Sequence, residues 1–140
     1  GLTPQTATSL GGFKVQGKSA EAGQRLCEDA MAMQEAGCFS IVVEAVPAPL
    51  ASHITELLSI PTIGIGAGNG CDGQVLVMHD LLGLYDRFTP KFVKQFARLG
   101  EVSIQALMEF KKEVENRSFP ATEHSFTMKE AEIAKLLKKE

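Results

Sequence analysis

Short apolar runs alternate along the chain with longer stretches in which apolar residues recur at helical spacing. The short runs, rich in β-branched residues, predict three strands: residues 39–43, 62–65 and 74–78. The longer stretches predict five helices: residues 19–36, 49–58, 89–100, 102–115 and 127–137. Strands that alternate with helices predict βαβ units in a parallel sheet, so the fold class is α/β.

Local signals refine several of these elements. Ser19 can cap the first helix, and Gly37 is placed to end it. In the second helix Ile54 and Leu57 are predicted to face inward, and residues 127–130 have the pattern of a capping box. The first strand is continuously apolar, which is typical of a strand that is covered on both faces.

Each predicted strand is followed by polar or glycine-rich residues. Glu44 follows the first strand, residues 66–69 follow the second, and His79 and Asp80 follow the third. In parallel α/β folds functional sites are built at the carboxyl ends of the strands, both in open sheets and in closed barrels. We therefore expect Glu44, residues 66–69 and His79 to gather at one mouth, although the connections do not decide between the two architectures.

Composition excludes several classes of protein. The chain has 140 residues, 44% hydrophobic and 22% charged, with a net charge of −3. This apolar content suffices for a packed core. No basic excess favours nucleic-acid binding, and no apolar run approaches the ~18 residues of a membrane span. Three unclustered cysteines and the lack of a signal-like segment favour a reducing, cytoplasmic compartment. The length predicts one domain or part of one.

Charge is distributed unevenly along the chain. Residues 101–140 carry 15 of the 31 charged side chains, whereas residues 36–78 carry only Glu44, Glu56 and Asp72. A long stretch with so little charge should lie mostly inside the protein. We therefore expect an α/β part over residues 1–100, and over residues 101–140 a solvated helical extension that packs on it or on a neighbouring subunit.

Glu44 is the strongest candidate for a catalytic residue. It follows Ile41–Val43 and precedes another apolar stretch, with no cation near it in the sequence. Apolar surroundings disfavour the charged form of a carboxylate and so make it a stronger base. The alternative is a carboxylate that caps or pairs with a neighbouring loop.

Other motifs are less informative. The glycine-rich stretch 64–70 lacks the following helix that a dinucleotide fingerprint requires, so it predicts a tight turn at the rim of a site. Asn69 in this stretch and Asp72 just after it are candidates for cofactor contacts. Adjacent side chains on a strand point to opposite faces, so His79 and Asp80 do not predict a metal pair, and no metal ligand is assigned.

Five segments in order resemble the ketopantoate hydroxymethyltransferase family: residues 1–5, 11–18, 43–47, 63–68 and 72–80. The resemblance continues through residues 90–92 and 119–125. It implies a (βα)8 TIM barrel, of which this chain would cover roughly the last four strands and the C-terminal helices. The chain resembles only the C-terminal half of the family, starting within the fifth strand, and its length agrees with a half barrel because a complete barrel takes ~250 residues.

The resemblance also implies an activity and partners. The family transfers a hydroxymethyl group from methylenetetrahydrofolate to the keto acid 3-methyl-2-oxobutanoate, forming ketopantoate for pantothenate and coenzyme A synthesis. Glu44 matches its catalytic base. The magnesium ligands, a lysine that contacts the keto acid, and a histidine two places before Gly1 would lie upstream. The chain alone is then expected to be inactive, to require the N-terminal half of the barrel, and to belong to a homo-oligomer.

Two other functions remain open at this stage. One is another metal-dependent barrel enzyme that acts on α-keto acids. The other is a non-catalytic half-barrel that serves as an interaction module.

Overall fold

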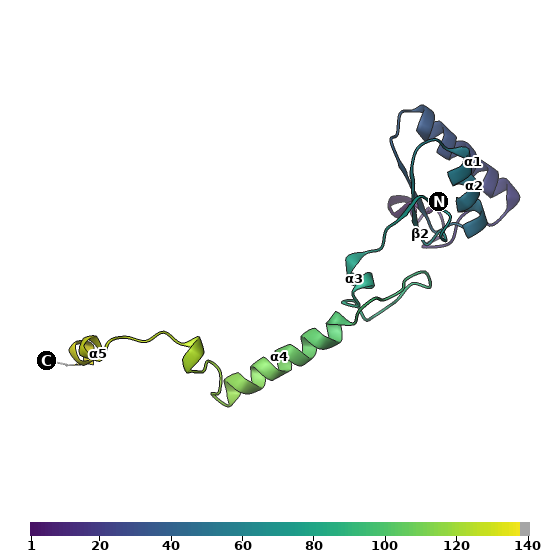
Figure 1. The fold of residues 1–140 in the computed structure, drawn as a ribbon. Coiled ribbons are helices and arrows are strands. Elements are labelled where there is room, and N and C mark those ends of the chain that lie inside the picture. The colour runs from purple at the N-terminus through teal and green to yellow at the C-terminus, as the bar shows by residue number, and fades with distance from the viewer. Residues whose placement is uncertain (138–140) are drawn as a thin grey trace. The chain divides into compact units, whose positions relative to one another are not determined.

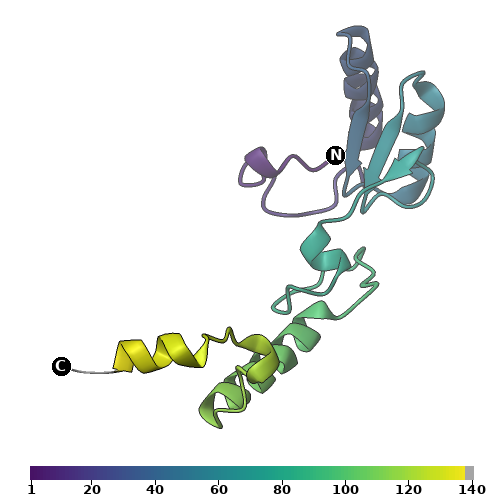
Figure 2. The same cartoon turned by 60° about the vertical axis from the view of Figure 1, so that its left-hand side comes forward.

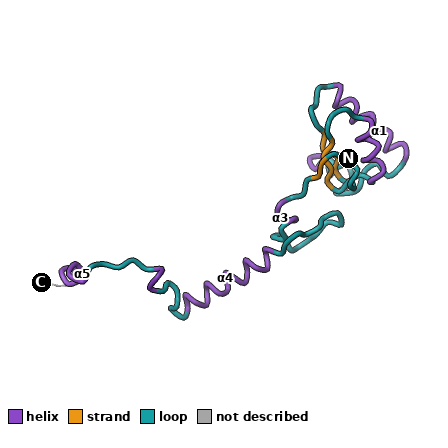
Figure 3. The backbone as a smooth tube through the Cα atoms, in the orientation of Figure 1, coloured by secondary structure: helices purple, strands orange, loops and turns teal. Residues whose placement is uncertain are grey.

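The computed structural model describes residues 1–137 and divides the chain into two compact units. The first unit spans Gly1–Ala97 and contains all the strands found among residues 1–137, as the orange segments of Figure 3 show. The second begins at Arg98 and is helical (Figure 1).

A three-stranded parallel sheet forms the centre of the first unit (Figure 2). Its strands lie in sequence order: β1 (Ile41–Glu44), β2 (Thr62–Ile65) and β3 (Gly73–Gln74). The predicted bounds of β2 are confirmed. The predicted first strand is shifted, since β1 begins two residues later and has Glu44 as its last residue, not as the residue after it.

Two helices, α1 (Ala20–Glu35) and α2 (Ala48–Leu57), pack on one face of this sheet. Ser19 caps α1 as predicted, because its side chain accepts a hydrogen bond from the amide of Ala22. Gly37 follows α1 with a φ of +92°, a left-handed conformation that glycine adopts without steric cost. The apolar core between helices and sheet is made of small and medium side chains: Cys27, Ala30, Val43, Val46, Ala51, Ile54 and Ala67.

Two predictions about burial need correction. Ile54 is buried at 3% exposure, but Leu57 is 42% exposed, so only one of the two faces the core. Val42 of β1 is 60% exposed. Successive side chains of a strand alternate between faces, so the helices cover the face that carries Val43, and the face of Val42 and Glu44 is open in the first unit.

The third predicted strand, over residues 74–78, is largely wrong. β3 has two residues, and the last ladder bond joins the amide of Val75 to the carbonyl of Gly64 at 3.0 Å. β2 ends at Ile65 and the chain turns at Gly66, which leaves residues beyond Val75 without a ladder partner on that side. Residues Met78–Leu81 instead form a short helix, α3.

A glycine-rich loop over residues 66–72 connects β2 to β3 in place of a crossover helix. The loop runs directly against α2, because a Cβ atom on Gly68 would collide with Ala48 and one on Gly70 with Ser52. The glycines thus permit close packing between loop and helix. This agrees with the predicted tight turn and supplies no helix N-terminus for a dinucleotide.

The helix predicted over residues 89–100 is absent. The chain makes a turn there, with the amide of Val93 bonded to the carbonyl of Pro90, and the amide of Phe96 returns to the carbonyl of Leu81. The aromatic residues whose spacing suggested a helix extend from this loop, and Phe92 lies against Gly66. Gly100 does not end a helix but lies in the first turn of α4 (Leu99–Glu115).

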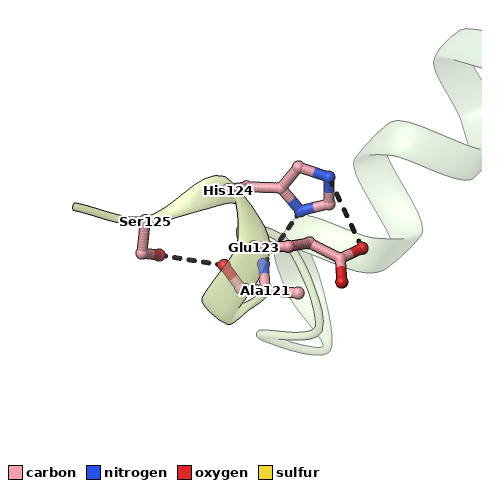
Figure 4. A network of polar contacts seen from close by, with 4 residues as sticks. All are labelled: Ala121, Glu123, His124 and Ser125. Atoms are coloured by element: carbon pink, nitrogen blue, oxygen red, sulfur yellow. Dashed lines mark hydrogen bonds and ion pairs between the residues drawn. The ribbon is translucent and has the colours of Figure 1, made fainter. Parts of the chain in front are cut away.

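The second unit consists of α4, a short 3₁₀ helix η2 (Thr122–His124) and α5 (Glu130–Leu137). The predicted helices over 102–115 and 127–137 are thus confirmed, although α5 begins at Glu130 and residue 127 does not cap it. Around η2, the Nδ1 atom of His124 accepts a hydrogen bond from the amide of Ala121 at 3.3 Å, and Ser125 Oγ donates to the Ala121 carbonyl (Figure 4).

The predicted role of residues 101–140 as an extension that packs on the barrel or on another subunit stays a prediction. The last three residues of this segment, 138–140, lie outside the described residues. In α4 the large apolar side chains are exposed within the described unit, among them Val102 and Phe110.

Candidate active site

The first unit contains a cavity of about 1060 Å³ at the carboxyl ends of its strands. Glu44, Gly66, Gly68 and Asn69 line it. The predicted gathering at one mouth is therefore confirmed for Glu44, Gly66, Gly68 and Asn69, whereas Ala67 is buried in the core. His79 does not line this cavity, because it lies on α3 and not at a strand end.

The backbone around Glu44 is held by the opening loop, which is the N-terminal segment over residues 1–18. The amide of Leu2 donates to the carbonyl of Glu44 at 2.8 Å, and the amide of Gln16 donates to the carbonyl of Ala45 at 2.9 Å. Ala45 has a φ of +49°, which is uncommon for a residue with a side chain and often marks a functional position. These contacts fix the end of β1 and with it the position of Glu44.

The carboxylate of Glu44 is partly buried and lines the cavity. Within residues 1–137 it makes no side-chain hydrogen bond and no ion pair. The alternative, in which this carboxylate caps or pairs with a loop, is therefore not the arrangement found in the described chain. A carboxylate that is held by its backbone and has no partner can accept a proton from a molecule in the cavity.

Asn69 and Asp72, the two candidates for cofactor contacts, lie in different places. Asn69 lines the cavity. Asp72 precedes β3 at the amino end of the strands, where its Oδ2 atom accepts hydrogen bonds from the amide and hydroxyl of Thr62 at 2.8 and 3.1 Å. Asp72 therefore joins the glycine-rich loop to the start of β2.

Hydrogen bonds from the backbone and then from the side chain of Thr62 hold the pKa of Asp72 below its usual value. A lowered pKa means that the ionised carboxylate stabilises the fold at pH values above the ordinary carboxyl pKa of about 3.9. This contribution is lost as the pH falls through the lowered pKa.

We expect Asp72→Asn to lower the melting temperature at pH 7, because the variant keeps an acceptor oxygen but loses the charge. The difference from the unsubstituted protein should shrink as the pH falls below about 4. Thermal unfolding at pH 7, 5 and 3 measures this, with the exposed Glu56→Gln as control. Equal melting temperatures at pH 7 would contradict the assignment.

Metal-ligating side chains do not cluster in the described chain. No group of three or more His, Cys, Asp or Glu residues among residues 1–137 is placed to hold an ion. The cysteines Cys27, Cys38 and Cys71 are free thiols. His79 and Asp80 share α3 and are not joined to a third ligand.

Several cavity residues were not identified from the sequence. They are Lys14 from the opening loop and a set from the loop that replaces the predicted helix: Phe88, Lys91, Phe92, Lys94 and Phe96. The resemblance of residues 90–92 to the family is a signal that this loop is part of the site. The spacing of the apolar residues over 89–100, however, predicts a helix there.

Comparison with known proteins identifies the family of the chain. The family model described as ketopantoate hydroxymethyltransferase matches residues 1–122. This match covers most of the chain. The chain belongs to the ketopantoate hydroxymethyltransferase family.

Relatives named 3-methyl-2-oxobutanoate hydroxymethyltransferase share more than half of their aligned residues with the chain. The protein of Syntrophobacter fumaroxidans is 59% identical over 136 residues, which are 97% of this chain and 48% of the relative. That of Heliobacterium modesticaldum is 63% identical over 128 residues, 91% of this chain and 46% of the relative. That of Moorella thermoacetica is 60% identical over 126 residues, 90% of this chain and 47% of the relative.

The chain spans about half the length of these curated ketopantoate hydroxymethyltransferase relatives. Within residues 1–137, no helix is both long and apolar enough to cross a membrane.

Proposed function

We propose that this chain forms the C-terminal half of a hydroxymethyltransferase and supplies its general base, Glu44. The substrates are 3-methyl-2-oxobutanoate and methylenetetrahydrofolate, and the product is ketopantoate. The observation that carries this proposal is the position of Glu44: it ends a parallel strand, lines the large cavity, and has no polar partner in the described chain.

The complete protein is proposed to be a (βα)8 barrel. In such a barrel the strands follow in sequence order and all helices lie on the outside. The order β1-β2-β3 with α1 and α2 on one face supports this architecture over an open sheet with helices on both faces. The exposed face of Val42 and Glu44 would then be the barrel interior.

The free edge of β1 supports the placement of the other half upstream. Ile41 and Ala45 hydrogen-bond toward β2, so the carbonyl of Glu44 points away from it. That carbonyl accepts the amide of Leu2. Residues that precede Leu2 would therefore continue along the free edge of β1, where the preceding barrel strand belongs.

The chemistry assigned to Glu44 is proton abstraction. Its carboxylate takes a proton from C3 of the keto acid, the carbon next to the carbonyl group, and the C–H electron pair stays on the substrate as an enolate. C3 then forms a carbon–carbon bond to the methylene carbon of methylenetetrahydrofolate. Both bonds from this carbon to folate nitrogens break with their electron pairs left on nitrogen, and a water molecule supplies the hydroxyl group. The proton taken by Glu44 and the remaining proton of the water go to the two nitrogens, so tetrahydrofolate leaves. The fixed backbone of Glu44 and Ala45 holds the base in place for proton abstraction.

Magnesium, which the family resemblance implies, does not fit the described residues alone. It prefers several oxygen ligands, whereas Glu44 is the single carboxylate among the cavity residues of the described chain. We therefore propose that its ligands lie in the upstream half. Assembly into a homo-oligomer stays a prediction.

A complementation experiment tests the proposed function. The chain is mixed with a polypeptide that comprises the N-terminal half of one of its relatives, together with magnesium, the keto acid and methylenetetrahydrofolate. We expect ketopantoate, detected by mass spectrometry, only when both halves are present. Formation of a different product from the keto acid would favour another α-keto-acid enzyme. A folded complex without any turnover would favour the non-catalytic module.

A further inference from the structure

The charged side chains of the first unit are unevenly distributed: most of its lysines line the cavity, and most of its carboxylates do not. Residues 1–97 contain four lysines, and three of them, Lys14, Lys91 and Lys94, line the cavity. The same residues contain nine carboxylates, and Glu44 alone of these lines it. A protein with net charge −3 thus presents a cationic lining here, which attracts an anionic ligand.

Aromatic side chains are concentrated on the same lining. Four of the eight phenylalanines of the chain contribute to it: Phe13, Phe88, Phe92 and Phe96. In the described unit they are largely exposed, with Phe92 the least so at 44%. Exposed aromatic residues gathered around one cavity indicate a surface that binds a flat or apolar ligand.

The loop that carries these residues is fixed against the carboxyl end of the sheet. The ring of Phe92 lies on Gly66, where a Cβ atom would be 2.8 Å from the ring. The ammonium of Lys94 lies 5.0 Å from the centre of the Phe96 ring, within range of a cation–π contact. Any side chain at position 66 would displace the ring of Phe92. Glycine at this position therefore allows Phe92 to form this wall of the cavity.

The keto acid does not account for this lining. It has no ring and one carboxylate, whereas three lysines and four phenylalanines line the cavity. A reduced folate has a flat pterin, a benzoyl ring, and a glutamate tail that carries two or more carboxylates. Its rings match the phenylalanines and its tail matches the lysines.

We propose that Lys91, Lys94 and Phe92, together with Lys14, form the subsite for the folate co-substrate. This inference rests on the proposed function and adds residues to it. The rings pack against Phe92 and the glutamate carboxylates pair with the lysines. Because Glu44 lines the same cavity, the subsite brings the one-carbon unit near the base.

Binding of a non-reactive reduced folate to the complete enzyme tests this subsite. The probes are 5-formyltetrahydrofolate with one and with three glutamates, measured by calorimetry at low and high salt. Each of Lys91→Ala and Lys94→Ala should weaken binding about three- to fivefold, the range of an exposed ion pair. The triglutamate should bind more tightly than the monoglutamate, and salt should reduce this advantage.

The chain offers a matched control for charge. Lys18 belongs to the same opening loop as Lys14 but does not line the cavity, so Lys18→Ala should leave folate affinity unchanged. Phe92→Leu keeps an apolar side chain and removes the ring, and it should weaken binding of both probes about fivefold, independently of salt.

The outcomes separate this subsite from the proposed function. If the double variant that combines Lys91→Ala with Lys94→Ala binds both folates as tightly as the unsubstituted enzyme, the assignment of this subsite is wrong. It is also wrong if the lysine variants weaken keto-acid binding instead. The proposed function is tested separately, by exchange of the keto acid's C3 proton with solvent in the unsubstituted enzyme without folate. If the unsubstituted enzyme exchanges this proton while the lysine variants keep their folate affinity, the subsite is overturned and the proposed function is not.

Discussion

Glu44→Gln in the complete enzyme is expected to lower the turnover number for ketopantoate formation by about 10²- to 10⁴-fold, the usual effect of losing a general base. Glutamine has nearly the same size and keeps a hydrogen-bonding oxygen, but it cannot accept the C3 proton at neutral pH. The KM for the keto acid should change little, because proton abstraction contributes to the transition state and not to ground-state binding. Steady-state kinetics with both substrates measures this.

The matched control for this variant is Glu56→Gln. Glu56 lies on α2 of the same unit, is exposed, and does not line the cavity. Its substitution should leave turnover within about twofold, since surface substitutions away from a site have small effects. A comparable loss of activity in both variants would show that charge in general, and not a base at position 44, is required.

Ile54→Ala is expected to cost about 2–5 kcal/mol of unfolding free energy, the range for truncation of a large buried aliphatic side chain. Ile54 is 3% exposed and belongs to the core between α2 and the sheet. Few large side chains share this core, so neighbouring groups have little freedom to fill the space. Urea unfolding followed by circular dichroism measures the loss.

Leu57→Ala on the same helix is the control for this expectation. Leu57 is 42% exposed and lies outside the core cluster. Its truncation should cost less than about 1 kcal/mol. Equal costs for the two variants would mean that both side chains face the core, as the sequence pattern predicts.

The elements that sequence reasoning located well are those with strong local signals. α1 has a capping serine at its start and a glycine at its end, and both act as predicted. β2 is bounded by Pro61 and the glycine-rich loop, and its predicted limits agree with the structure. In both cases the bounds follow from residues within the element or next to it.

The errors arise where distant contacts decide the local structure. Residues 75–78 have the apolar composition of a strand. However, β2 ends at Ile65 and the chain turns at Gly66, so no further ladder partner is available on that side. Residues 89–98 have helical spacing, yet they form a loop in which Phe92 lies on Gly66 and Phe96 bonds to Leu81. Neither contact is visible in the local pattern.

The same distinction applies to the site. The position of Glu44 at the cavity could be predicted because a strand and its carboxyl end are local features, and the same argument places Gly66, Gly68 and Asn69 there. The lysines and phenylalanines of the cavity come from two loops that are separated by some 75 positions, and only the folded chain brings them together. Asp72 and Asn69 are close in sequence but lie at opposite ends of the strands, so sequence proximity alone misplaces Asp72.

The most direct test of Glu44 as the base is exchange of the C3 proton of 3-methyl-2-oxobutanoate with deuterium. Proton NMR follows it in the complete enzyme without folate, so that the first step is observed alone. We expect the unsubstituted enzyme to exchange this proton and Glu44→Gln to exchange it about 10²- to 10⁴-fold more slowly. Exchange by Glu44→Gln at the rate of the unsubstituted enzyme would contradict the assignment of Glu44 as the base.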